Sequence, residues 1–158
     1  MSLLEIKSIN TYYGESHILR NVDMNVKSGE MVCLIGRNGV GKTTLLKSLI
    51  GLLKPRKGDI IFKGSSLLRK EPHARAKLGM AYVPQGREII PYLTVEENLL
   101  IGLEALPGGL TKNNKIDPIV YELFPILKDF LSRKGGDLSG GQQQQLAIAR
   151  ALLGKPKL

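Results

Sequence analysis

One eight-residue segment limits the possible folds of this chain more than any other. Gly36-Arg37-Asn38-Gly39-Val40-Gly41-Lys42-Thr43 matches G-x-x-x-x-G-K-[ST] at every fixed position. The apolar run Met31–Ile35 before it is typical of a strand buried on both faces, and Lys42–Ile50 after it is typical of a helix stopped by Gly51. The segment therefore predicts an α/β fold with a phosphate-binding loop between a strand and a helix.

The residue types in this loop suit a nucleoside triphosphate. Its glycines let the backbone curl with the amides pointing inward, and the positive end of the helix dipole favours anions. Lys42 supplies a mobile charge for the β and γ phosphates, and the Thr43 hydroxyl is placed to ligate Mg²⁺. Expected phosphate contacts come from Gly36, Asn38, Gly39, Gly41, Lys42, Thr43 and Thr44. The loop alone leaves kinases, GTPases and motor ATPases open.

Further elements follow from periodicity and turn residues. Alternation over residues 22–26 predicts a strand, and apolar runs predict strands at Asp59–Phe62 and Met80–Val83. A capping box, Thr94 with Glu97, predicts a helix that ends at residues 107–109. A loop is expected at Thr111–Lys115, and a helix over Ile116–Phe130, broken before Pro125. A strand-rich core is thus interrupted by a mostly helical insert.

A second glycine motif, Leu138-Ser139-Gly140-Gly141-Gln142, lies near the end of the sequence. Ser139 and Gln142 form another capping box, which predicts a helix over Gln142–Leu153 with one apolar face. Its two glycines expose backbone amides, so the motif is either a second anion-binding helix terminus or a plain helix start.

Composition excludes several classes. Hydrophobic residues make up 42% of the chain, and the single cysteine, Cys33, cannot form an internal disulfide. The apolar runs are too short to cross a bilayer, which predicts a cytoplasmic protein. The net charge of +9 is compatible with nucleic acid, an anionic membrane surface or a phosphate ligand. Aromatic residues at 5%, without tryptophan, disfavour a platform for single-stranded nucleic acid.

Taken together, these motifs resemble ATP-binding cassette (ABC) proteins. Residues 138–153 resemble the family's signature motif, Tyr82-Val83-Pro84-Gln85 its glutamine loop, and Tyr13 the aromatic that stacks on adenine. The resemblance implies a P-loop NTPase (RecA-like) core with an N-terminal antiparallel β subdomain and a helical insert. The implied domains are residues 1–86 for the β subdomain and phosphate loop, 87–137 for the helical subdomain and 138–158 for the signature segment.

The resemblance also implies roles for individual residues. Tyr13, rather than its neighbour Tyr12, would stack on the base of ATP, and Gln85 would contact Mg²⁺ or its water. The signature residues would contact the γ-phosphate of ATP bound to a second cassette subunit, paired head to tail: Ser139, Gly140, Gly141 and Gln142.

A narrower resemblance is to the ATPase subunits of bacterial urea and branched-chain amino-acid importers, and it is carried by Tyr12–Gly14, Gly36–Gly41, Pro84–Ile89 and Leu93–Asn98. It implies an ATP hydrolase on the inner face of the cell membrane, bound to permease subunits and to no specific nucleic acid. A soluble cassette acting on nucleic acid or ribosomes is the alternative. In importers a permease helix docks beside Gln85, so the apolar segment Gly86–Leu93 is expected either to receive it or to pack as core.

The sequence departs from the family pattern at its end. The family continues with a strand ending in Asp-Glu, followed later by a histidine, but this sequence ends at Leu158, and His17 and His73 lie elsewhere. A chain truncated there lacks the catalytic carboxylates, so we expect it to bind nucleotide weakly and not to hydrolyse it alone. Without that neighbouring strand, the apolar side chains of Met31–Ile35 are expected to be exposed.

Overall fold

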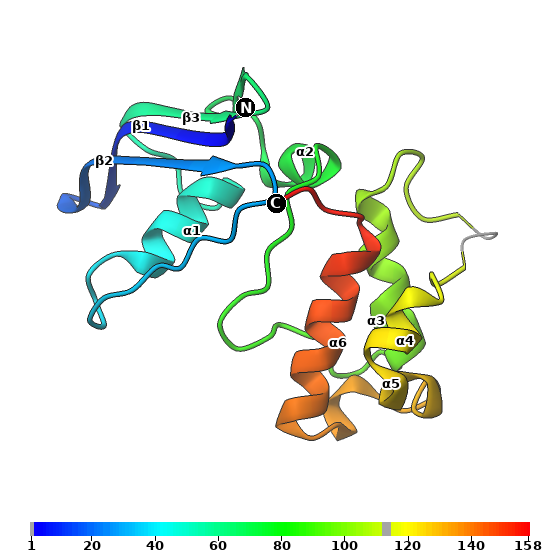
Figure 1. Ribbon diagram of the computed structural model, residues 1–158. Coiled ribbons are helices and arrows are strands. Elements are labelled where there is room, and N and C mark those ends of the chain that lie inside the picture. The colour runs from blue at the N-terminus through cyan, green and yellow to red at the C-terminus, as the bar shows by residue number, and fades with distance from the viewer. Residues whose placement is uncertain (1, 112–114) are drawn as a thin grey trace. The chain divides into compact units, whose positions relative to one another are not determined.

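The computed structural model describes residues 2–111 and 115–158 (Figure 1). The chain divides into two compact units, unit 1 (Met1–Arg75) and unit 2 (Ala76–Leu158), and the helix α2 (Pro72–Lys77) contains the boundary. The predicted domain limits at residues 86 and 137 stay a prediction. Residues 112–114 of the expected loop Thr111–Lys115 lie outside the described residues.

Unit 1 is built on an antiparallel sheet with the strand order β2-β1-β3-β4. The strands are β1 (Ser2–Tyr13), β2 (Ser16–Lys27), β3 (Lys57–Phe62) and β4 (Ser65–Ser66). Leu4 of β1 pairs with both Val26 of β2 and Phe62 of β3, and all three side chains are buried on the core side. The predicted strands at residues 22–26 and 59–62 and the antiparallel N-terminal subdomain are thereby confirmed.

The helix after the glycine-rich loop, α1 (Lys42–Ile50), packs on this sheet (Figure 1). Its buried residues Leu45 and Leu49 join the core, and the Thr11 hydroxyl of β1 lies 3.2 Å from the Ser48 hydroxyl of α1. Gly51 ends the helix in the left-handed conformation with φ 89°, as predicted, and its N–H donates to the Lys47 and Ser48 carbonyls.

Unit 2 is helical. It contains α3 (Val95–Ile101), α4 (Ile119–Leu123), α5 (Pro125–Asp129) and α6 (Gly140–Leu153), with 3₁₀ turns η1 (Gly102–Ala105) and η2 (Gly135–Asp137). The buried core side chains come from all four α-helices and their connections: Val95, Leu99, Leu103, Val120, Leu127, Leu138, Leu146, Ala149 and Leu153. The helical insert is confirmed, and the helix over residues 116–130 is broken at Phe124, immediately before Pro125.

Both predicted capping boxes are present. The Thr94 hydroxyl accepts from the Glu97 N–H, and the Glu97 carboxylate accepts from the Thr94 N–H at 2.7 Å. Hydrogen bonding of the Glu97 carboxylate to Thr94, first to its backbone N–H and then to its side chain, lowers the pKa of Glu97. At the start of α6 the same arrangement joins Ser139 and Gln142.

Two predicted strands, Met31–Ile35 and Met80–Val83, are wrong: neither segment is a strand. The described sheet offers neither of them a neighbour, and a strand without a neighbour cannot satisfy its backbone groups. The Gly79 N–H bonds to the Ala76 carbonyl, and the other printed backbone bonds of residues 79–81 join the chain's last residues, as in the bond from the Ala81 N–H to the Leu158 carbonyl. The expected exposure of the first segment is confirmed, since Met31 is 96% and Ile35 89% exposed.

None of the described helices is both long and apolar enough to cross a membrane.

Candidate nucleotide-binding site

The glycine-rich loop presents a helix N-terminus with open amide groups. The first hydrogen bond of α1 runs from the Leu45 N–H to the Gly41 carbonyl, so the N–H groups of Lys42, Thr43 and Thr44 lie outside the helix's own bonding. Among the described residues no side chain caps this end. The arrangement suits an anion such as a phosphate group.

Glycine is required by the backbone at Gly41. Its φ is 103°, and a Cβ atom there would lie 2.8 Å from Leu19 Cδ2 of β2. The loop is therefore held close to the sheet, which fixes the direction of α1 and its free amides.

Lys42 folds back over the loop that precedes it. Its Nζ donates to the carbonyl oxygens of Gly36 and Arg37, both at 2.6 Å. The ammonium group therefore lies beside the exposed loop, where a bound phosphate would meet it.

The two threonines after Lys42 differ in exposure. Thr43 is exposed, so its hydroxyl is accessible to a Mg²⁺ ion that accompanies a triphosphate, whereas the Thr44 side chain is buried and that residue offers only its N–H. Within residues 2–111 and 115–158, no group of three or more His, Cys, Asp or Glu could hold a metal by itself. The donor set fits Mg²⁺ only as a companion of bound phosphates.

The opposite end of α1 is held by Arg75, which the sequence analysis missed. Its guanidinium is 2% exposed and donates to the carbonyls of Ser48 and Leu49 at the C-terminus of α1 and to those of Leu67 and Lys70. Burial lowers the pKa of Arg75, while Glu71 raises it. A cation at the negative end of the helix dipole stabilises the helix that carries the phosphate loop.

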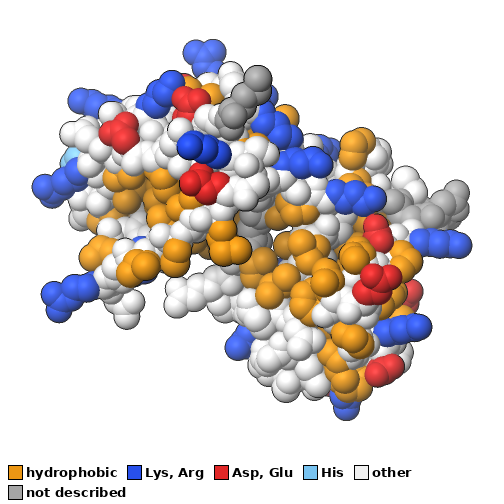
Figure 2. Space-filling view, in the orientation of Figure 1, with side chains coloured by type: hydrophobic (Ala, Val, Ile, Leu, Met, Phe, Trp, Pro, Cys, Tyr) orange, Lys and Arg blue, Asp and Glu red, His pale blue; other side chains and the backbone are white. Residues whose placement is uncertain are grey.

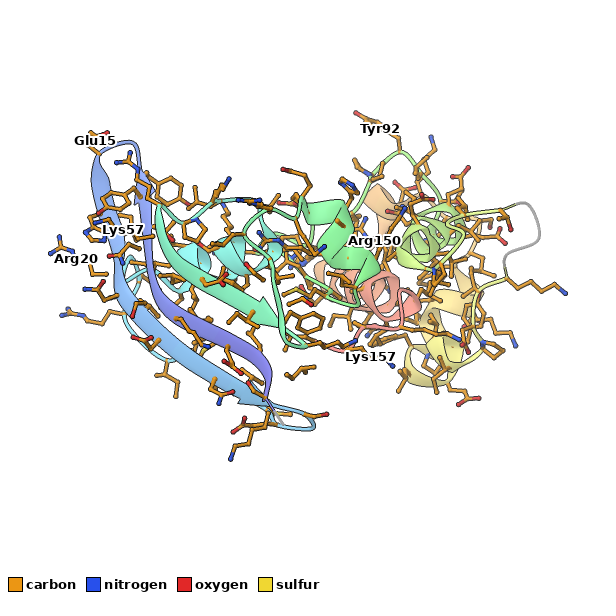
Figure 3. The ribbon with its side chains drawn as sticks, turned by 90° about the horizontal axis from the view of Figure 1, so that it is seen from above. Glu15, Arg20, Lys57, Tyr92, Arg150 and Lys157 are labelled. Carbon is orange, nitrogen blue, oxygen red and sulfur yellow. The ribbon has the colours of Figure 1, made fainter. Side chains whose placement is uncertain are left out.

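The hairpin between β1 and β2 leaves Tyr13 available. Tyr12 is already engaged, because its ring stacks on His17 at 4.1 Å and the Arg56 guanidinium lies 4.5 Å from its centre. Arg56 also donates to the Gly14 carbonyl and contacts Glu15, which Figure 3 labels at the tip of the hairpin. Tyr13 is 46% exposed and is the aromatic free to meet a base.

We predict that Tyr13→Ala weakens ATP binding by about tenfold, because stacking of a base on an aromatic ring contributes about 1–3 kcal/mol. Tyr13→Phe keeps the ring and should retain the wild-type affinity. Titration calorimetry with Mg-ATP measures both variants. Equal affinities for Tyr13→Ala and Tyr13→Phe would show that the base lies elsewhere.

The signature residues form the exposed first turn of α6. Ser139 and Gln142 are used in the capping box, with the Ser139 N–H donating to Gln142 Oε1 at 2.8 Å. Gly140 and Gly141 are exposed, and a Cβ at Gly141 would meet no atom within 4 Å. This helix start can approach an anion on another molecule.

Gln85 is exposed in the turn that precedes Arg87, a residue that contacts the signature turn. Arg87 Nη1 donates to Gln143 Oε1 at 3.4 Å, and a Cβ at Gly140 would lie 3.2 Å from Arg87 Nη2. The structure thus brings the glutamine-loop segment and the signature turn together within unit 2. Thr43 belongs to unit 1, and the prediction that it shares a Mg²⁺ with Gln85 stays a prediction.

The chain is similar to known proteins over most of its length. The sequence profile described as "ABC transporter" matches residues 19–158. The chain is 41% identical to the high-affinity branched-chain amino acid transport ATP-binding protein BraG of Pseudomonas aeruginosa, covering 99% of the chain and 66% of that protein. It is also 41% identical to the probable branched-chain amino acid transport ATP-binding protein LivF of Archaeoglobus fulgidus, covering 97% and 64%. Less similar relatives include spermidine/putrescine and Fe³⁺ import ATP-binding proteins, each at 36% identity.

A solved dimeric bacterial ABC transporter cassette superposes with a TM-score of 0.83 at 31% identity, covering 97% of this chain and 70% of that one. The expected P-loop NTPase core is therefore confirmed, and the chain spans about two thirds of the length of the relatives it matches. This chain belongs to the ABC transporter family.

Proposed function

We propose that this chain is the nucleotide-binding part of an ATP-hydrolysing subunit that powers a membrane importer. The observation that carries the proposal is the open N-terminus of α1 beside Lys42, a site with backbone amides and a cation for phosphate. The relatives named above are transport or import ATP-binding proteins. This chain covers 66% and 64% of the length of the first two relatives. Hydrolysis is therefore proposed for the whole protein and not for this chain by itself.

In this proposal, unit 1 supplies most of the contacts to the nucleotide, and Gln85 comes from unit 2. The loop Gly36–Thr43 and the N–H of Thr44 hold the phosphates, Tyr13 stacks on the base, and Thr43 and Gln85 contact Mg²⁺. Mg²⁺, when bound with ATP, neutralises charge on the β and γ phosphates. The signature residues Ser139–Gln142 act on ATP held by a second subunit, which makes the functional unit a dimer.

The transported solute is proposed to be a branched-chain amino acid, since both relatives at 41% identity carry that name. Urea, the other solute indicated by the sequence resemblance, is the second candidate. A nucleic-acid function is the less favoured alternative, since on the face that Figure 2 shows the Lys and Arg side chains are scattered among other types.

We also propose that the segment Gly86–Leu93, called here the docking segment, receives the permease and places the subunit on the inner face of the membrane. Tyr92 is 84% exposed and points outward in Figure 3, and Ile90 is 39% exposed. Ile89, in contrast, packs against the core of unit 2. Exposed apolar side chains on an anchored loop suit a partner surface.

The test uses the full-length subunit with its permease. We predict that Tyr92→Asp abolishes stimulation of ATP hydrolysis by the permease while ATP affinity and melting temperature stay unchanged, because Tyr92 makes little contact with its own unit. Leu123→Asp is the matched control, since Leu123 is an exposed apolar residue of α4 outside the segment. Full stimulation of Tyr92→Asp, or its unfolding, would refute the docking proposal.

A further inference from the structure

Two residues of the docking segment have a backbone conformation that L-amino acids rarely adopt. After Gly86 with φ 90°, Arg87 has φ 71° and Glu88 has φ 47°. A side chain in this left-handed region crowds its own backbone, and two consecutive cases persist only when surrounding contacts hold them.

Arg150, from the last turn of α6, supplies such a contact. Its Nη2 donates to the Glu88 carbonyl at 2.7 Å and lies 3.5 Å from the Arg87 carbonyl. Figure 3 shows Arg150 within the helical unit, and burial lowers its pKa while the Glu88 carboxylate raises it. The guanidinium therefore lies against the carbonyls of Arg87 and Glu88 and supplies a charged donor to the strained turn.

The first turn of the same helix contacts the same turn of the docking segment. The Arg87 side chain reaches back to Gln143 and covers Gly140, as described above. Both ends of α6, called here the signature helix, therefore contact residues 87–88.

Asn98 of α3 holds the far end of the docking segment. Its side chain is fully buried; Oδ1 accepts from the Ile90 N–H at 2.9 Å, and Nδ2 donates to the Ile90, Leu93 and Thr94 carbonyls. The segment is thus fixed at Glu88 by α6 and at Ile90 by α3, so a displacement of α6 must act on residues 87–88.

We propose that Arg150 is a positioning residue that holds the strained turn Arg87–Glu88 and thereby transmits movement between the signature helix and the docking segment. The inference deepens the proposed function and rests on it for the partner. Arg150 itself contacts the backbone of the segment, and it acts on the permease only through the position of residues 86–93.

The first experiment measures amide hydrogen exchange of residues 86–93 by mass spectrometry in the full-length subunit without the permease. Arg150→Met is expected to raise exchange there by about tenfold, because the held conformation loses its charged donor. Arg150→Lys, which keeps the charge but not the planar fork, is expected to lie between Arg150→Met and wild type. If Arg150→Met does not fold, Arg150→Lys is compared with the wild type in its place.

Two substitutions at Glu88, one to asparagine and one to glutamine, separate relief of backbone strain at that residue from a general loss of protein stability. Asparagine tolerates the left-handed region better than other non-glycine residues, and glutamine differs from it by one methylene. In the Arg150→Met background, Glu88→Asn is expected to lower the exchange by at least about twofold relative to Glu88→Gln. Equal exchange in the two double variants would overturn the proposal, as would wild-type exchange in both Arg150→Met and Arg150→Lys.

The second readout is the ratio of permease-stimulated to basal ATP hydrolysis, which does not depend on the fraction of folded protein. Arg150→Met is expected to lower this ratio by at least about threefold with the KM for ATP unchanged, and Glu88→Asn to restore part of it. A wild-type ratio in Arg150→Met would overturn the coupling. If the wild-type subunit itself shows no stimulation, the proposed docking fails, while the exchange comparison still decides whether Arg150 holds the turn.

Discussion

Lys42→Ala is expected to weaken Mg-ATP binding by about 10- to 150-fold, which corresponds to losing a charge-assisted contact worth about 1.5–3 kcal/mol. The Lys42 ammonium lies at the glycine-rich loop, bonded to the Gly36 and Arg37 carbonyls, beside the predicted phosphate site. The methyl group of alanine carries no charge and cannot replace the lysine ammonium there. Titration calorimetry on the full-length subunit measures the affinity.

Lys54→Ala is the control for this substitution, because Lys54 is an exposed lysine just after the same helix. It should bind Mg-ATP like the wild type. If Lys42→Ala and Lys54→Ala bind with equal affinity while both remain folded, the phosphate site has been assigned to the wrong loop.

Arg75→Met is expected to lower the free energy of unfolding by about 4 kcal/mol, among the largest effects of a single substitution. The change keeps a long apolar stem but removes the guanidinium donors from three carbonyls: Leu49 loses its donor, while Ser48 and Leu67 keep only the backbone N–H groups of Gly51 and Lys70. A close approach adds to the effect: a Cβ at Gly51 would lie 2.8 Å from Arg75 Nε, so the guanidinium fills this space tightly.

Urea unfolding followed by circular dichroism measures the loss. Arg69→Met, at an exposed arginine of the same unit, should change the free energy of unfolding by no more than about 0.5 kcal/mol. An Arg75→Met variant as stable as Arg69→Met would mean that the carbonyls at the end of α1 find other donors.

Residues that lie close together in the sequence were sufficient to predict where most of the helices begin or end. The Thr94 and Ser139 capping boxes, the break before Pro125 and the Gly51 stop were all predicted, because each depends on residues within one or two turns. The phosphate-binding loop is predicted in the same way, since its motif is continuous in the sequence.

Long-range requirements explain what was missed. Met31–Ile35 has the composition of a buried strand, but a strand forms only where a neighbour supplies hydrogen bonds, and none of the described segments does so. Arg75 and Arg150 bond to carbonyls far away in the chain, for which arginine alone carries no sequence signal. Asn98 could have been noticed, because a polar residue beside Val95 and Leu99 lies on the buried face of its helix.

In the proposed dimer, the phosphate loop of one subunit works with the signature turn of another. Gly141→Asp tests it, because a Cβ there meets open space and a carboxylate suits a helix N-terminus, so the fold should persist while phosphate is repelled. Gly141→Ala, which adds no charge, is the control. In the full-length protein, Lys42→Ala alone and Gly141→Asp alone should each be nearly inactive in ATP hydrolysis.

Mixing these two inactive variants is the most direct measurement. In a head-to-tail dimer, one site of the mixed pair combines an intact Lys42 with an intact Gly141, whereas neither variant can build such a site by itself. We expect the mixture to hydrolyse ATP several-fold faster than either variant alone, up to about one quarter of the wild-type rate for random pairing. A mixture no more active than its components, with both variants folded, would contradict it.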